Sequence, residues 1–381
     1  MDTPLHIVAA WNNFIYISSD VKFYGPYNAD EMIEDYGPSE DKRVSSWKAR
    51  SYFVSKLIVA GADVNKLNKD GNTPLHAAAR KNNDGDTPLH LAASKNHRES
   101  ATKLIAAGAI KNSVNKDGYT PLEIAALNGH KDFISLLLPL VEDLNQADGD
   151  TPLCLAVRGK RKDVVLHLVS VGANVNQEGK NNDTPLSVAA NIGDKTIPEI
   201  LLSNGAIVNQ EDKSGKSSLF VAAEHGHYLV VSILISFDAN VNQEDKFGRT
   251  PLLIAAQNGH KDAVTLLLAA KANKTQVDIY GDTPLYVAVW KGHADIVSLL
   301  ISARVNVNQA HKNGDTFLYV AARNEHNDVV SLLLSAGANV NQGNAFGKTP
   351  LFIAEWNGKS EVVSTLIRAG ANMYQANILD G

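Results

Sequence analysis

The sequence predicts an all-α solenoid, a stack of helix-turn-helix units with projecting β-turns or short hairpins as fingers. Two observations support this fold class: a motif that begins Thr-Pro-Leu recurs along the chain, and two short helical patterns follow most of its occurrences. The chain has 381 residues, which is long for one ordinary hydrophobic core. Stacked units avoid this limit because each buries its apolar face against the next, and all share one continuous core.

The spacing of the motif sets the length of the repeat. The motif begins at Thr151 and then every 33 residues, at Thr184, Ser217, Thr250, Thr283, Thr316 and Thr349. Earlier starts lie at Thr3, Thr73, Thr87 and Thr120. So many consecutive starts in register do not arise by chance, and we expect one domain over residues 1–381 with about ten two-helix repeats.

Each repeat contains the signals that begin and end two helices. In the repeat at Thr250, the threonine is a helix N-cap and Pro251 takes the first helical position, where its missing N–H is not needed. Gly259 then ends the first helix, since glycine adopts the left-handed conformation without strain. Apolar residues spaced by three and four, as in residues 329–334, predict the second helix. A polar stretch with a further glycine, such as Gly347, predicts the finger.

Three irregularities interrupt this pattern towards the N-terminus. An insertion over residues 14–47 separates the two helices of the first repeat, and residues 73–86 form a half-repeat without a second helix. The repeat at Thr120 has 31 residues and has lost two near residues 146–148. Because the insertion and the half-repeat interrupt contacts between neighbours, we expect the least stable part of the chain before residue 87.

The full pattern, D-x-x-G-x-T-P-L-x-x-A-A-x-x-G-H followed by L-L-L-x-x-G-A-x-V-N, resembles the ankyrin repeat over nearly the whole chain. The family's Thr-Pro-Leu-His is complete at His6, His76 and His90. In the family this histidine helps to hydrogen-bond adjacent repeats. Later repeats replace it with Glu123, Cys154, Ser187, Phe220, Leu253, Tyr286, Tyr319 and Phe352, so we expect them to rely more on apolar packing. We interpret the four aromatic replacements as packing residues.

Composition excludes several classes of function. The chain has 36 Lys and Arg against 41 Asp and Glu, a net charge of −5 that argues against a sequence-independent nucleic-acid binder. Its single cysteine, Cys154, excludes an internal disulfide framework and fits a reducing compartment. No apolar run approaches the roughly 20 residues of a membrane span, and no signal peptide is visible. We expect a cytoplasmic location, or a host cytosol if the chain comes from an intracellular bacterium.

Several short motifs imitate catalytic or metal sites. Gly215-Lys216-Ser217 and Gly347-Lys348-Thr349 resemble the end of a phosphate-binding loop, but both lack its first glycine and align with ordinary fingers. His225-Gly226-His227 has no further ligand at zinc spacing. The basic run 158–162 reads as a solvated turn between helices, with contact to an acidic partner as the alternative. The acidic residues of the insertion could pair for acid–base work, but a solvated short helix explains them as well: Asp30, Glu31, Glu34 and Asp35. We therefore predict no catalytic residue, no cofactor and no metal.

The resemblance implies a non-catalytic scaffold that binds a partner protein through a concave face and the fingers. Exposed aromatic residues at such positions are typical of binding hot spots. Mapped onto this sequence, the partner-binding positions of the later repeats are Phe247, Arg249, Gln257, Ile279, Tyr280, Trp290, Lys291, Arg323, Phe346, Lys348 and Trp356. Earlier repeats offer Trp11, Tyr119, Leu127, Lys213, Lys216 and His225.

Two other functions stay open. The chain is alternatively an ankyrin segment of a larger enzyme, channel or secreted bacterial effector whose chemistry lies elsewhere, because neither end shows a recognisable polar capping face. A weaker alternative is a small-molecule or nucleotide binder that uses the same aromatic residues. We expect a monomer with a protein partner, no nucleic acid and no membrane insertion.

Overall fold

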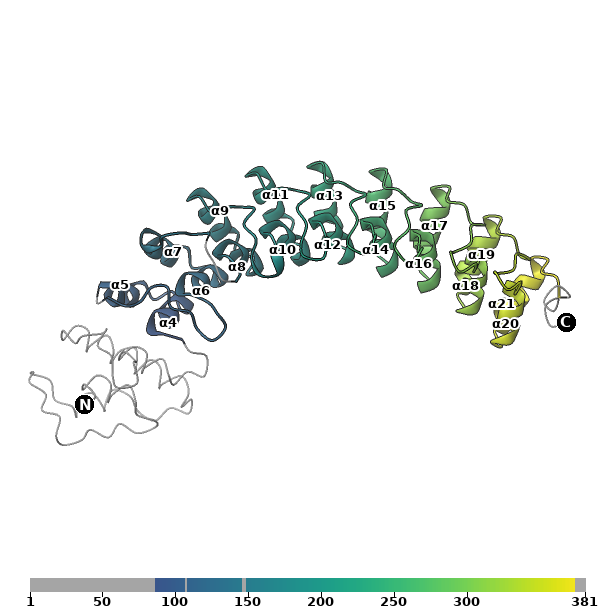
Figure 1. Cartoon of the computed structure of the whole chain (residues 1–381), viewed down its shortest axis with the longest axis horizontal. Coiled ribbons are helices and arrows are strands. Elements are labelled where there is room, and N and C mark those ends of the chain that lie inside the picture. The colour runs from purple at the N-terminus through teal and green to yellow at the C-terminus, as the bar shows by residue number, and fades with distance from the viewer. Residues whose placement is uncertain (1–85, 107, 146–148, 374–381) are drawn as a thin grey trace, which may run out of the picture. The chain divides into compact units, whose positions relative to one another are not determined.

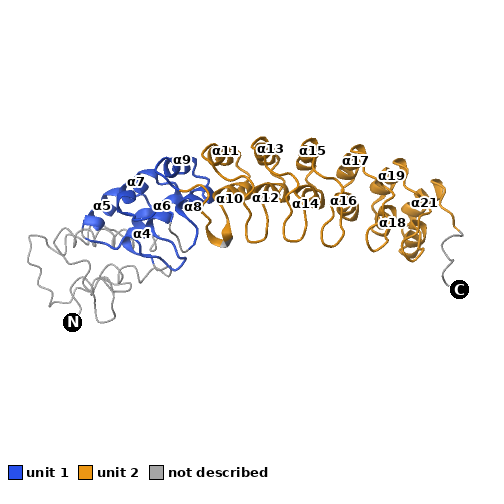
Figure 2. Ribbon diagram, turned by 45° about the horizontal axis from the view of Figure 1, so that its top comes forward, with its two compact units in different colours: residues 1–173 blue, residues 174–381 orange. Residues whose placement is uncertain are grey.

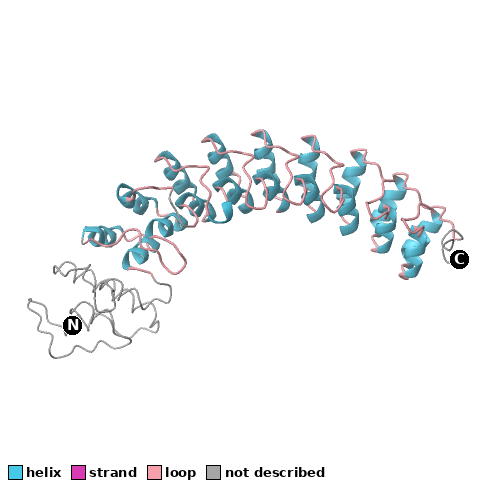
Figure 3. Cartoon of the chain, in the orientation of Figure 1, coloured by secondary structure: helices cyan, strands magenta, loops and turns pink. Residues whose placement is uncertain are grey.

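The computed structural model describes residues 86–106, 108–145 and 149–373 of the chain, and these residues form paired short helices (Figure 1). Connecting turns and loops join the helices, and no strand occurs in these ranges apart from two isolated bridges, Glu211 with Ser217 and Ala310 with Thr316 (Figure 3). The all-α fold class is thus confirmed. The predicted insertion over 14–47, the half-repeat over 73–86 apart from its last residue, and the deletion near 146–148 lie outside the described residues.

The chain divides into two compact units, residues 1–173 and 174–381 (Figure 2). In the first unit, the helices that follow the Thr-Pro-Leu starts, which we call first helices, are α4 (Pro88–Ser94), α6 (Pro121–Asn128) and α8 (Pro152–Arg158). The second helices are α5 (Arg98–Ala106), α7 (Lys131–Leu137) and α9 (Lys162–Ser170). A short 3₁₀ helix, η1 (Leu138–Leu140), follows α7.

The second compact unit contains six complete helical pairs in the described residues. Its first helices are α10 (Pro185–Ile192), α12 (Ser218–Glu224), α14 (Pro251–Asn258), α16 (Pro284–Lys291), α18 (Phe317–Arg323) and α20 (Pro350–Trp356). Its second helices are α11 (Thr196–Ser203), α13 (Tyr228–Ser236), α15 (Lys261–Ala269), α17 (Ala294–Ser302), α19 (Asn327–Ser335) and α21 (Ser360–Arg368). A 3₁₀ helix, η2 (Lys180–Asn182), lies in the first finger of this unit.

The first helices begin where the sequence predicts. In α14 the hydroxyl oxygen of Thr250 accepts a hydrogen bond from the N–H of Leu253 at 3.2 Å, and Pro251 occupies the first turn. The residue after Thr-Pro-Leu, which is the histidine position of the family, is polar in three repeats. There its side chain accepts a hydrogen bond from the N–H of the N-cap residue. His90 accepts from Thr87 at 3.0 Å, Glu123 from Thr120 at 2.7 Å and Ser187 from Thr184 at 2.9 Å. The phenylalanine and leucine replacements have no polar side-chain atom for this second bond.

The hydrophobic core is centred on the first helices. Every residue of α14 from Pro251 to Ala256 is buried, and Ala255 and Ala256 are small enough to let neighbouring first helices pack closely. The second helices bury one stripe each, such as Ala263, Val264 and Leu267 of α15. Consequently the side chains that remain free to meet a partner on the first-helix row are those at the C-terminal ends of its helices.

Histidines just before the second helices connect one repeat to the next. The Nε2 atoms of His227, His260, His293 and His326 each lie 3.0–3.1 Å from a carbonyl oxygen near the end of the preceding first helix. Each ring also covers a glycine: a Cβ atom on Gly226 would meet the His260 ring at 2.5 Å. Glycine is therefore favoured at this position for two reasons: its φ is positive, and the histidine ring that packs on it leaves no room for a Cβ atom.

Candidate functional site: the fingers and the ends of the first helices

Each finger is a tight turn built around one polar side chain. Asp245 accepts hydrogen bonds from the N–H groups of Phe247 and Arg249, both at 2.9 Å, and Gly248 supplies a φ of 72°. Asp212, Asp278 and Asn344 hold their fingers in the same way. This arrangement directs the two residues after the polar side chain to the tip of the finger.

Backbone hydrogen bonds connect neighbouring fingers within the second compact unit. The N–H of Lys246 donates to the carbonyl of Ser214, and the N–H of Ile279 donates to the carbonyl of Phe247, each at 3.0 Å. In Figure 2 these fingers extend from the first-helix row, on the side away from the second helices. The tips of these three fingers consequently lie side by side, although they are 33 residues apart in sequence.

The predicted apolar tip residues are all exposed. The exposed fraction is 45% for Phe247, 58% for Ile279, 54% for Tyr280 and 69% for Phe346. None of these side chains is needed by the core, because the corresponding tip positions in other repeats are Lys213, Ser214 and Asn313.

The two tryptophans at the ends of first helices are also exposed. Trp290 follows a run of buried residues in α16 and is 45% exposed, and Trp356 ends α20 and is 76% exposed. The backbone of Trp290 is nevertheless fixed, since its carbonyl oxygen accepts from His326 at 3.1 Å and from Asn324 at 3.3 Å. Gln257 and Arg323, at the same helix ends, are half-buried.

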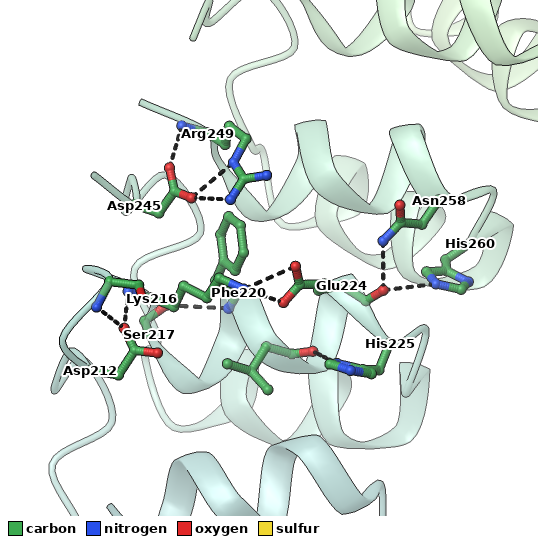
Figure 4. A network of polar contacts seen from close by, with 12 residues as sticks. Asp212, Lys216, Ser217, Phe220, Glu224, His225, Asp245, Arg249, Asn258 and His260 are labelled. Carbon is green, nitrogen blue, oxygen red and sulfur yellow. Dashed lines mark hydrogen bonds and ion pairs between the residues drawn. The ribbon is translucent and has the colours of Figure 1, made fainter. Parts of the chain in front are cut away.

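Some predicted cations are neutralised inside the structure. Arg249 donates to Asp245 through Nε at 2.8 Å and Nη2 at 2.6 Å (Figure 4). Its guanidinium also lies 5.2 Å from the ring centre of Phe247. Lys216 pairs with Glu224 at 2.7 Å, and Arg323 lies 3.5 Å from Asp315. The Lys216 and Arg323 pairs each join a finger to its own first helix, whereas the Arg249 pair lies within its finger. Sequence spacing did not reveal these pairs.

Other predicted cations are exposed and lie against aromatic rings. The ammonium of Lys291 is 4.3 Å from the ring centre of Trp290, and that of Lys348 is 5.1 Å from Phe352. Lys312 lies 5.8 Å from the ring centre of Tyr280 in the preceding finger. These distances are within the range of cation–π attraction.

The aromatic residues at the former histidine position are packing residues, as predicted. Phe220, Tyr286 and Tyr319 are buried, and Lys216 and Arg249 cover the ring of Phe220 at 5.3 and 5.6 Å (Figure 4). Phe352 is half-buried and stacks on Trp356 with ring centres 5.9 Å apart. It belongs to the last described repeat, where no following finger among the described residues covers it.

One cluster at the base of two fingers was missed by sequence reasoning. His311 stands where most other fingers have Asp or Asn, stacks on Tyr286 at 4.2 Å between ring centres, and places Nε2 3.1 Å from Asp282. Burial is the main cause that raises the pKa of the Asp282 carboxyl, and the neighbouring Asp278 raises it further. The break in the repeat pattern at residue 311 is the signal that could have identified this cluster.

The sequences that imitate catalytic or metal sites have structural roles. Lys216 is paired with Glu224, and Ser217 caps α12, so this loop is an ordinary finger. His225 and His227 contact backbone carbonyls of Val221 and Asn191, respectively. Within the described residues, no group of three potential metal ligands occurs.

Two further sequence interpretations have structural outcomes. The basic run 158–162 is more than a solvated turn, because Arg158 pairs with Asp150 at 2.9 Å and Arg161 donates to the carbonyl of Leu127 at 3.0 Å.

Cys154 is fully buried, and this burial raises the pKa of its thiol to about 11. A thiol with such a pKa is a poor nucleophile at neutral pH. None of the described helices is long and apolar enough to cross a membrane.

These features define a helical repeat protein that displays fingers and helix ends along one side of stacked helical pairs. Models of ankyrin repeats, each containing three copies, match residues 89–179, 153–245, 219–310 and 303–377. The chain therefore belongs to the ankyrin-repeat family, a general protein-interaction module whose domains are typically non-catalytic.

Comparison with solved structures gives the same fold. The crystal structure of the human ASB11 ankyrin repeat domain is similar to this chain, with a TM-score of 0.53 and 31% sequence identity. The similarity covers 58% of this chain and 99% of the ASB11 chain. No curated protein matches the sequence.

Proposed function

We propose that this chain is a non-catalytic scaffold that binds a partner protein through its fingers and the ends of its first helices. The observation that carries the proposal is the exposure of Trp290 and Trp356 at the ends of first helices whose preceding residues are mostly buried, with the Trp290 backbone held by His326. A large aromatic side chain on a rigid backbone buries much area at low entropic cost when a partner covers it. Family membership supports a protein partner, since ankyrin repeats bind proteins.

The proposed surface comprises the exposed tips Phe247, Ile279, Tyr280 and Phe346, the helix-end residues Gln257, Trp290, Lys291, Arg323 and Trp356, and Arg249 and Lys348 beside the finger glycines. We further propose that the whole chain is a single repeat domain and that it acts in a reducing compartment such as the cytosol. The buried thiol of Cys154 supports this location, because no second cysteine exists with which it could form an internal disulfide.

Selection of peptides from a displayed random library against the full chain tests the proposal. Trp290→Ala and Trp356→Ala should each lower the affinity for the selected peptides about thirtyfold. This corresponds to the loss of roughly 2 kcal/mol of binding free energy expected for a hot spot. Both variants should melt like the wild type, since a surface substitution changes the free energy of unfolding by about 0.5 kcal/mol or less.

Two controls separate binding from folding. Tyr228→Ala removes a side chain with the same 45% exposed fraction as Trp290, but from second helix α13, and should leave peptide binding unchanged. Tyr319→Ala removes a buried packing residue and should lower the melting temperature, with a cost of about 3 kcal/mol. Selected peptides that depend on Tyr228 and tolerate both tryptophan substitutions would contradict the proposed surface.

A further inference from the structure

On the fingers and first helices of the second compact unit, most exposed charged side chains are basic, whereas most acidic side chains are buried or half-buried. We consider the five segments 212–225, 245–258, 278–291, 311–324 and 344–357, which together form the finger surface. The exposed basic residues on it are Lys213, Lys246, Lys291, Lys312 and Lys348, whereas Glu355 is its one exposed carboxylate residue. Two further exposed carboxylate residues, Glu211 and Glu244, lie one residue before the first two segments. This excess is notable in a chain with a net charge of −5.

The remaining carboxylates of the finger surface are buried or half-buried, and each has a partner within the fold. Asp245, Asp278 and Asp315 are buried, and the first two accept the N–H groups of their own finger turns. Glu224 is engaged by Lys216, and Asp282 lies beside His311. In contrast, none of the five exposed lysines has a carboxylate partner within 4.0 Å in the described residues.

Three of these lysines are placed next to aromatic rings. Lys291 lies over Trp290, Lys312 over Tyr280 and Lys348 over Phe352, at 4.3, 5.8 and 5.1 Å from the ring centres. A lysine that contacts a ring keeps its charge and can still receive a carboxylate. The surface thus repeatedly presents a cation directly beside an apolar ring.

We propose that the finger surface binds an acidic polypeptide segment with interspersed apolar side chains, an inference that rests on the proposed function above. Carboxylates of the segment pair with Lys291, Lys312 and Lys348, while its apolar side chains cover the rings beside them. Such charge complementarity increases the rate of association and selects the partner. The fixed spacing of the fingers favours a segment whose charges alternate with apolar anchors.

A single-stranded nucleic acid also combines negative charge with flat rings, but it fits this surface less well. Its phosphates carry one charge per nucleotide and are best met by a dense basic groove. Here Asp212, Glu224, Asp282 and Glu355 lie among the lysines and would repel such a continuous charge. A polypeptide can place its carboxylates at the lysines and neutral groups elsewhere.

The test uses the full chain and a displayed library of random peptides. We expect the enriched peptides to carry Asp or Glu next to aromatic or aliphatic residues. The triple variant Lys291→Glu, Lys312→Glu and Lys348→Glu should lower the affinity for these peptides by at least about tenfold. Raising the salt concentration from about 50 to about 200 mM should also weaken binding, because the exposed charges are screened.

The matched control reverses three exposed lysines outside the finger surface, Lys195→Glu, Lys261→Glu and Lys271→Glu, and should change the affinity less than about twofold. A peptide with its acidic residues replaced by lysine should bind the triple variant better than it binds the wild type. This rescue separates charge pairing from any loss of structure.

The outcomes distinguish the inference from the proposed function. Enriched peptides that are neutral or basic, but still need Trp290 or Trp356, would overturn the acidic partner and leave the proposed function standing. Peptides that ignore both tryptophans would overturn the proposed function as well. Oligothymidylate that binds more tightly than the peptides, and competes with them, would replace the acidic segment with a nucleic acid.

Discussion

At the scale of single residues, the position that ends each first helix shows how a local and a tertiary constraint act together. Gly193, Gly226, Gly259 and Gly292 occupy it with φ between 74° and 82°, and a histidine of the next repeat packs on each. In the repeat at Thr316 the residue is Glu325, still with a φ of 62°. The next repeat has Lys359 instead of histidine, and this lysine pairs with Glu325 at 2.5 Å. The missing ring is what leaves room for a side chain.

The backbone of Glu325 still carries the cost of a left-handed conformation in a residue with a Cβ atom. Glu325→Gly should raise the free energy of unfolding by about 0.5–1 kcal/mol, since the exposed ion pair that it removes is weak. Urea unfolding followed by circular dichroism measures this gain.

The matched control for this prediction is Gly292→Ala. A Cβ atom there would lie 2.7 Å from the His326 ring at a φ of 77°, so we expect a loss of about 2 kcal/mol or more. A stabilising Gly292→Ala would show that the histidine ring can move away at little cost.

The buried thiol of Cys154 makes stability depend on pH in the alkaline range. Its pKa is raised from 9.0 to about 11 in the folded chain, mainly by burial. Below the lower value both states keep the proton. Between the two values the unfolded state loses it first, so the free energy of unfolding falls by about 1.4 kcal/mol per pH unit as the pH rises.

The difference between the wild type and Cys154→Ala isolates this effect from other groups that titrate in the same range. The wild type should lose more stability than the variant between pH values of about 9 and about 11. Parallel pH profiles for the two proteins would exclude a buried, protonated thiol.

At the scale of elements, the finger is the unit that links side-chain chemistry to the binding surface. Asp245 holds the turn through two N–H groups and also receives two hydrogen bonds from Arg249. Asn344 performs the first task in its finger without a negative charge. The turn therefore needs an accepting oxygen, whereas the ion pair needs the charge.

Substitutions at Asp245 separate these two tasks. Asp245→Ala removes both and leaves Arg249 without its carboxylate, so the free energy of unfolding should fall by about 3 kcal/mol. Asp245→Asn keeps an acceptor for the turn and should cost about 1 kcal/mol. Chemical denaturation of both variants gives the comparison, and equal costs would mean that the turn does not depend on the side-chain oxygen.

At the scale of the whole molecule, contacts within the second compact unit run from each repeat to its neighbours. Asparagine side chains form one such connection: Asn176, Asn209, Asn242, Asn308 and Asn341 each accept a hydrogen bond, at 2.7–2.8 Å, from a backbone N–H of the following repeat. With such connectivity, stability is close to a sum of repeat and interface contributions.

A truncation tests this additivity. Removing the chain from residue 344 onward deletes α20, α21 and one interface, and the remaining repeats should stay folded with a lower free energy of unfolding. The slope of the free energy of unfolding against denaturant concentration should also decrease, in proportion to the surface that the lost repeat buries. Complete loss of helical circular dichroism would show instead that the last repeat is required for the others to fold.

The sequence by itself determined the repeat length, the helix caps, the buried rows and the exposed aromatic positions. These features follow from local signals, such as Thr250 before Pro251 or the apolar spacing in 329–334, that repeat in register. Because the repeat length places each backbone position relative to the core, the exposure of its side chain can be predicted without knowledge of distant neighbours.

The tertiary structure alone decided which charges on that surface are free. Arg249, Arg323 and Lys216 look equivalent to Lys291 and Lys348 in sequence, yet buried or half-buried carboxylates engage the first three. The stacking of His311 on Tyr286 is likewise set between repeats. Side-chain pairing depends on distances of a few ångströms between elements, and a repeat pattern does not specify such distances. Physical packing thus left the exposed lysines as the charges that can meet a partner.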